Sequence, residues 1–293
     1  MKITEYPSVT ELDDDNVFLL DGSNGTKTIA KSDLTYALFD SIPSMHCQLI
    51  RGKNLGTTYT SAQQEAVQNG TFHDLWIGDY WTEGGIKYYI VDINYFKTIP
   101  ADRGDIEAKP DANNLSNHLI LMASSGASNV KWHSKSGEEN VPFSNSTIYT
   151  VDLPNYVANS IPNIFKNYLV NKAHNISAAM QNDRVTGLAL VQASCMVPTV
   201  SQILGIYNPL ASLNPAGNYI ADVATTRGDR QFAAFQNSLF ISNSFKVESG
   251  FWTRDLDGPW GIAIQAWNGS GMYFGPNTKD TAKNLLPYFI VGY

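Results

Sequence analysis

The sequence predicts an α+β fold in which short antiparallel strands dominate and a few helices pack beside them. Three observations support this prediction. Short apolar and aromatic runs alternate with turn residues such as Gly, Asn and Pro, whereas apolar residues at helical spacing occur in only a few segments. Apolar residues make up 43% of the 293 positions, which is enough to bury one large core or two modest ones.

The first 42 residues are predicted to form a small unit that cannot fold alone. Two β-prone runs, 17–20 and 26–29, flank an Asn-Gly loop, which is a pattern typical of a hairpin. A Ser-Asp pair then caps a short helix that runs through Leu34 and ends before Pro43. Because so short a unit buries little apolar surface, we expect residues 1–42 to pack against a partner chain or a larger body.

Residues 43–74 are predicted to be a connecting segment with one helix. That helix covers residues 61–68 and stops at an Asn-Gly pair. The main body, residues 75–293, opens with a second hairpin, in which strands 77–81 and 86–92 flank a Glu-Gly-Gly turn.

The rest of the body mixes strands with two predicted helices. Residues 118–122 form a short apolar strand. Residues 153–169 have apolar side chains at helical spacing, with Pro162 at a start or a kink, and residues 231–240 predict a second helix. Short aromatic strands separated by Gly and Asn follow, at residues 251–254, 261–264, 272–274 and 288–291.

Charge and hydropathy argue against several classes of protein. The net charge is −7 and Lys and Arg form no stripe, so we expect no nucleic-acid partner. No apolar stretch approaches the length of a membrane span, and the chain opens without an apolar signal segment. We therefore expect synthesis in the cytoplasm and no insertion into a membrane.

The sequence carries none of the usual catalytic motifs, so we predict that the protein is not an enzyme and binds no cofactor. The five histidines are scattered, and Asp13, Asp14 and Asp15 are adjacent rather than spaced like calcium ligands, so we predict no metal site. Cys47 and Cys195 are interpreted as two buried thiols.

The last third of the chain combines aromatic rings with amide side chains, which is what a surface that binds sugars or protein epitopes needs. Phe251 and Trp252 lie in a dense apolar run and are predicted to fill the core, and Arg254 beside them is predicted to be structural. Other residues neighbour Gly and Pro, so we expect loop positions. The predicted ligand-binding residues are Trp260, Gln265, Trp267, Asn268, Tyr273 and Asn277.

Residues 75–293 also resemble a family of uncharacterised proteins found in phages and prophages of gut Firmicutes. The hairpin that opens with Gly78-Asp79-Tyr80 matches the family's first strand pair. The chain departs from the family at its end, where residues 285–289 lack the Arg of the family's val-arg-pro close. Further blocks match in the same order, at residues 146–149, 153–154, 164–169, 196–205, 231–235 and 251–255.

The family is similar in outline to C-type-lectin-like folds, including receptor-binding proteins of some phages, in which the last segment forms the display surface. The resemblance therefore implies a C-type-lectin-like body that holds loops for recognition. Residues 13–21 and 25–29 resemble the N-termini of phage tail-fibre and head-fibre proteins, which anchor a fibre to the particle. That resemblance implies virion attachment through Phe18, Leu19, Leu20, Ile29 and Leu34.

The resemblance implies a phage virion protein that recognises a host-surface glycan or protein without covalent chemistry. Its partners would be other virion proteins of the capsid or tail, and it would form a homo-oligomer, with a trimer as the first expectation. One alternative is a capsid decoration or head-fibre protein with a purely structural role. Another is a glycan hydrolase that uses Asp255 or Asp257, although two loop aspartates so close together are more often turn-formers.

Overall fold

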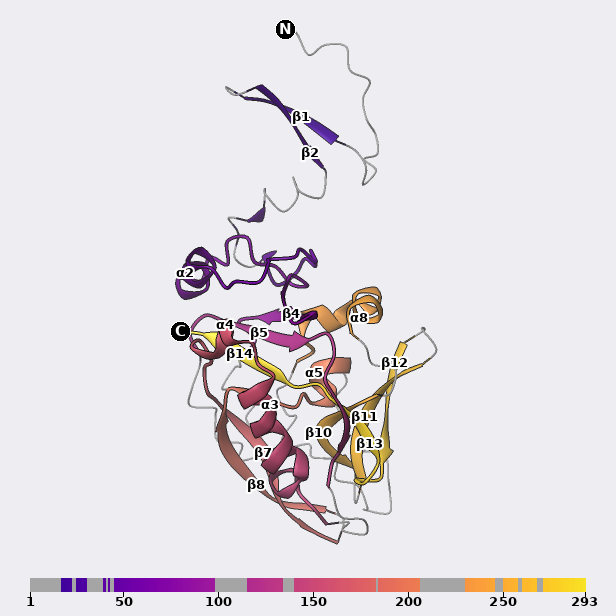
Figure 1. The fold of residues 1–293 in the computed structure, drawn as a ribbon. Coiled ribbons are helices and arrows are strands. Elements are labelled where there is room, and N and C mark those ends of the chain that lie inside the picture. The colour runs from indigo at the N-terminus through magenta and orange to yellow at the C-terminus, as the bar shows by residue number, and fades with distance from the viewer. Residues whose placement is uncertain are drawn as a thin grey trace, which may run out of the picture.

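The computed structural model is a mixed α+β fold with mostly antiparallel sheets, as the sequence predicts (Figure 1). Its described residues form two five-stranded sheets and two two-stranded sheets. The structure describes residues 17–22, 25–30, 39–40, 42, 45–97, 115–133, 140–182, 184–205, 230–245, 250–257, 260–267 and 271–293.

The central sheet is the most deeply buried part of the described chain. Every residue of its strands β5 and β14 is buried, so both faces of these strands are covered. The last strand of the chain therefore belongs to the core rather than to the display surface that the resemblance implies for the last segment. In order across the sheet, the strands are β3 (Tyr80–Glu83), β4 (Ile86–Ile93), β5 (His118–Ala123), β14 (Tyr288–Gly292) and β9 (Cys195–Met196).

The second five-stranded sheet brings together distant parts of the chain. Its pairs are antiparallel except for β10 and β13, which run parallel. The predicted strands at 251–254, 261–264 and 272–274 are confirmed, whereas β6 and β13 were not predicted. The order across the sheet is β12 (Gly271–Asn277), β11 (Trp260–Trp267), β10 (Phe251–Asp257), β13 (Ala282–Leu285) and β6 (Ala127–Lys131).

The two remaining sheets are hairpins. Strands β1 (Val17–Gly22) and β2 (Gly25–Ala30) pair in the register Val17 to Ala30, at the place where the sequence predicts a hairpin. The helix predicted to follow it, with Leu34, lies outside the described residues. Strands β7 (Lys172–Gln181) and β8 (Arg184–Ala193) form a longer hairpin that the sequence analysis missed, because Ala, Gly and Asn weaken the strand pattern there.

Helix α2 (Ser61–Asn69) confirms the predicted helix. Thr60 forms a capping box: its hydroxyl accepts the Gln63 amide at 3.3 Å, and the Gln63 side chain accepts the Thr60 amide at 2.9 Å. Gly70 ends the helix at φ 70°, a left-handed conformation that favours glycine. A Cβ at Gly70 would also lie 2.6 Å from the Asn117 side chain.

Two helix predictions are wrong in extent. The segment 153–169 holds α3 (Leu153–Asn159) and the short α4 (Asn163–Lys166), because Pro162 interrupts the helical hydrogen bonds. The helix expected at 231–240 is a 3-10 turn followed by α8, because the Asn237 side chain accepts the Phe240 amide at 2.9 Å and starts a new helix. The remaining elements are η2 (Phe143–Asn145), η3 (Ile148–Asp152), α5 (Val200–Leu204), η4 (Ala233–Gln236) and α8 (Ser238–Ser244).

One hydrophobic cluster joins the two five-stranded sheets, the hairpin of β7 and β8 and the helices packed against them. Val67 and Phe72, at 0% and 1% exposure, belong to it, so part of the 43–74 segment packs into the same core as the main body. Cys195 is buried as expected, whereas Cys47 is half-buried, so the interpretation of two buried thiols is only half right. Among the described helices, none combines the length and apolarity needed to cross a membrane.

Candidate functional site

The residues predicted to bind a ligand lie on strands rather than in loops. Trp260 begins β11, and Asn277 ends β12. The expectation of loop positions is wrong, because the neighbours Gly261, Gly275 and Pro276 are themselves strand residues of β11 and β12. Asn268 lies outside the described residues, and the remaining members of the set, also on these two strands, are Gln265, Trp267 and Tyr273.

The strand register divides this set into two groups. Gln265 pairs directly with Tyr273, and Gly261 pairs with Asn277. Because successive residues of a strand alternate between its faces, odd-numbered positions of β11 share one face and Trp260 belongs to the other. Trp260 is 44% exposed and Asn277 is half-buried. The candidate ligand surface is therefore centred on the exposed ring of Trp260.

The aromatic residues predicted to fill the core do so. Phe251 and Trp252 are completely buried. The indole N–H of Trp252 donates to the Val130 carbonyl at 2.9 Å, and its ring meets Trp132 edge-on at 5.8 Å. A Cβ at Gly261 would lie 3.0 Å from the Trp252 ring, so the close approach of β11 to this pair requires glycine.

The two residues after these core aromatics are also buried. Arg254 is 3% exposed, and its amide donates to the Pro198 carbonyl at 3.1 Å, in agreement with the predicted structural role. Asp255 is 1% exposed, and its Oδ2 accepts the amide of Val200 at 2.5 Å, at the start of α5. Asp255 and Asp257 lie on strand β10, so the interpretation as loop aspartates is wrong.

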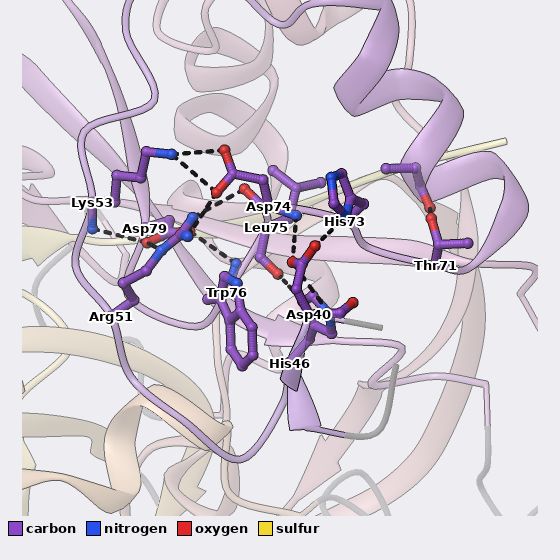
Figure 2. Close-up of polar contacts among 11 residues, drawn as sticks. Asp40, His46, Arg51, Lys53, Thr71, His73, Asp74, Leu75, Trp76 and Asp79 are labelled. Carbon is purple, nitrogen blue, oxygen red and sulfur yellow. Dashed lines mark hydrogen bonds and ion pairs between the residues drawn. The ribbon is translucent and has the colours of Figure 1, made fainter. Parts of the chain in front are cut away.

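An ion-pair network that the sequence analysis missed surrounds Arg51 (Figure 2). Its guanidinium binds Asp79 through two nitrogens, with Nε to Oδ1 at 3.1 Å and Nη2 to Oδ2 at 2.6 Å. Asp79 also accepts the amides of Lys53 at 2.8 Å and Trp76 at 2.9 Å. Arg51 Nη1 and Lys53 Nζ both bind the carboxylate of Asp74.

The two carboxylates of this network differ in their environment. Burial raises the pKa of Asp79 above its ordinary value, although Arg51 works in the opposite direction. Asp74 is half-exposed, so the hydrogen bonds from Lys53 and Arg51 outweigh its partial burial and lower its pKa. Arg51 therefore favours the charged form of the buried Asp79. The pair also joins residues 51–53 to the start of the central sheet.

The same region holds a second polar group around His46 (Figure 2). The ring is completely buried, stacks on Trp76 with centroids 4.1 Å apart, and places Nδ1 2.6 Å from the Leu75 carbonyl oxygen. Asp40 accepts the Asp74 amide at 2.8 Å and contacts the His73 ring. These contacts attach Asp40 and His46 to the turn before the central sheet.

A second buried ion pair lies on the central sheet. Asp92 is completely buried, and both of its oxygens accept Arg230 nitrogens at 2.6 Å. Asp92 also accepts the Ala233 amide at 2.9 Å, while Arg230 lies over the Tyr95 ring at 4.5 Å. The pair fastens the segment at 230–236 to strand β4.

His118 and His174 are buried near the same sheet. Nε2 of His118 accepts the Phe96 amide at 3.0 Å, so Nδ1, which lies 2.8 Å from the Ser116 carbonyl oxygen, carries the proton. Burial lowers the pKa of His118 to about 4, and burial also lowers that of His174. Both rings are therefore neutral parts of the core at neutral pH.

These polar groups make internal hydrogen bonds, which favours structural roles for them. No local signal marks them, because Arg51 and Asp79, like Asp92 and Arg230, are distant in sequence and meet only in the fold. Within the described part of the chain, no three His, Cys, Asp or Glu side chains gather closely enough to hold a metal ion. Asp13, Asp14 and Asp15 lie outside that part. The best-supported candidate site is therefore the surface around Trp260.

Comparison of the chain with family models, curated proteins and solved structures found no match.

Proposed function

We propose that the protein is a phage virion protein with a C-type-lectin-like body that binds a host-surface glycan or protein without covalent chemistry. The observation that carries the proposal is Trp260, a tryptophan 44% exposed at the start of β11. A large exposed ring supplies contact area at low conformational cost, and Trp is enriched where proteins bind partners. The resemblance of residues 75–293 to phage proteins supports the biological setting.

Attachment to the particle is assigned to the N-terminal hairpin. Strands β1 and β2 form a two-stranded sheet of their own, and such a hairpin is at best marginally stable alone. A neighbouring virion protein would supply the surface against which this hairpin packs. Many copies on one particle would then give strong adhesion from weak single sites.

The hydrolase alternative is weakened by the surroundings of Asp255. A general acid or nucleophile must reach the substrate, whereas Asp255 is 1% exposed and accepts the Val200 amide at 2.5 Å. Its hydrogen bond to the start of α5 indicates a structural role for Asp255. The capsid-decoration alternative shares the attachment step and differs only in lacking a host ligand.

The test uses the full chain in binding assays on host cells and on a glycan array. We expect Trp260→Ala to weaken binding by about tenfold or more. Val151→Ala is the matched control, because Val151 is 47% exposed on η3 and belongs to no predicted site. Binding that survives Trp260→Ala would contradict the proposed site, and electron microscopy of the particle would separate adhesion on the tail from decoration of the head.

A further inference from the structure

The hairpin of β7 and β8 has an edge that no other described strand covers. The two strands pair antiparallel along ten residues each, and they form a sheet of only two strands. In Figure 1, β8 lies along the outside of the body. Within the described chain, no backbone hydrogen bond joins residues 185–193 to a segment other than β7. No described strand therefore occupies the outer edge of β8, where a further strand can pair.

Strand β8 alternates between an inner and an outer face. Val185, Ala189 and Val191 pack against the hydrophobic core. Leu188 and Leu190 point the other way, with exposures of 41% and 50%. Two neighbouring leucines exposed on the same face of an edge strand form an apolar stripe that water disfavours.

The same strand has little of the usual protection against pairing with another chain over residues 188–193. Natural edge strands are commonly blocked by charged residues, proline or a bulge. Residues 185–193 contain no charged residue and no proline, and the register irregularities lie before Leu188, so that residues 188–193 pair regularly with β7. Strands β7 and β8 also contain no Asp or Glu, although the whole chain has a net charge of −7. Two copies of this acidic chain can therefore meet at this hairpin without bringing carboxylates of either strand together.

We propose that β8 pairs antiparallel with β8 of a second copy of this chain, across a twofold axis at Ala189. Antiparallel pairing of identical strands is self-complementary, as a twofold interface requires. An axis at Ala189 places Leu188 of one copy opposite Leu190 of the other, and Thr186 opposite Gln192. Both leucines of each copy are then covered by the leucines of its partner.

The proposal goes beyond the ligand surface and does not depend on it. It commits the oligomer to a twofold contact rather than to the trimer expected from fibre proteins. One pair of strands covers less area than a standard protein interface, so the dimer should form in a concentration-dependent way. Joining two bodies would double the number of Trp260 surfaces per assembly.

The first test measures the mass of the full chain by light scattering or sedimentation over about a hundredfold range of concentration. We expect a monomer–dimer equilibrium whose dissociation constant rises by about tenfold or more in Leu188→Asp combined with Leu190→Asp. Val151→Asp is the matched control, because Val151 is equally exposed at 47% but lies on η3. Circular dichroism checks that each variant remains folded. A chain that is monomeric throughout, or an oligomer that the double variant leaves intact, would overturn the proposal.

The second test fixes the register in a Cys47→Ser background. Leu188→Cys and Leu190→Cys proteins, one carrying a size tag, are oxidised separately and as a mixture. The proposed register puts positions 188 and 190 directly opposite, at about 5 Å between Cβ atoms, whereas like positions lie diagonally at about 7 Å. Random pairing in an equimolar mixture would make the mixed product half of all disulfide. We expect the mixed disulfide to exceed the two self-disulfides taken together. A mixed product of half of the total or less would overturn the register at Ala189.

Discussion

Trp252 and Trp260 lie on neighbouring strands, and their surroundings differ completely. Trp252 on β10 is fully buried, with its indole N–H bonded to the Val130 carbonyl at 2.9 Å. Trp260 on β11 is 44% exposed. The same residue type thus supports the core at one position and is left facing solvent at the other. This difference, rather than aromatic content, identifies the part of the second sheet that is available for binding.

Truncating each of the two tryptophans in turn should give the largest difference in stability. Trp252→Ala removes a fully packed ring and should lower the free energy of unfolding by about 3 to 5 kcal/mol. Trp260→Ala should lower it by much less, about 1 kcal/mol, because 44% of the residue is already exposed to solvent. Chemical denaturation of both variants measures the two effects. A large loss of stability in Trp260→Ala would mean that this ring belongs to the core and would remove the argument for a ligand surface.

The buried core contains an ion pair as well as rings, and this gives the second prediction. Arg230→Ala leaves Asp92 completely buried without the guanidinium that binds both of its oxygens at 2.6 Å. We expect a loss of about 3 kcal/mol, at the lower end for broken buried pairs because Arg230 is itself half-exposed. Asp92→Asn combined with Arg230→Ala should recover part of the loss, because the buried charge is gone. Urea denaturation measures both variants, and no recovery in the double variant would contradict this reason.

Acid should lower the free energy of unfolding through the buried histidines of the core. The pKa of His118 falls from an ordinary value of 6.5 to about 4, because burial disfavours the charged form of the ring. The unfolded chain therefore binds the proton first, so stability is complete above pH 6.5 and is lost as the pH falls towards 4. The largest loss from this group is about 3 kcal/mol. His174, whose pKa burial also lowers, acts in the same direction.

Thermal unfolding between neutral pH and pH 4.5 tests this sign. His118→Gln should be less stable than the parent protein at neutral pH, but its stability should depend less steeply on pH. An equally steep dependence in that variant would assign the acid sensitivity to other groups.

The sequence predicts local structure well where short-range signals decide it. Thr60, Gln63 and Gly70 mark the ends of α2, and the Glu-Gly-Gly turn marks the hairpin of β3 and β4. It fails where a distant partner decides the structure. Strands β7 and β8 lack β-branched runs and are stabilised by each other and by the core behind them.

The candidate site shows the same limit. Aromatic and amide residues at 260–277 can be found in the sequence, but their division between two faces of a strand depends on register. Arg51 with Asp79, and Asp92 with Arg230, are invisible before folding because each pair is brought together by the central sheet. The alternation of residue types therefore predicts the strands. Only the packing of the fold shows that Trp260 is exposed and Trp252 is buried.

The smallest predicted effect concerns the exposed part of the Arg51 network. Lys53 Nζ binds Asp74 at 2.7 Å, and both side chains are 48% exposed. Water and salt screen such a pair, so Lys53→Ala should cost no more than about 1 kcal/mol and the difference from the parent protein should shrink in high salt. Arg51→Ala should cost more and should keep its effect in salt, because Asp79 is buried. If both substitutions cost the same, burial would not be what distinguishes the inner carboxylate from the outer one.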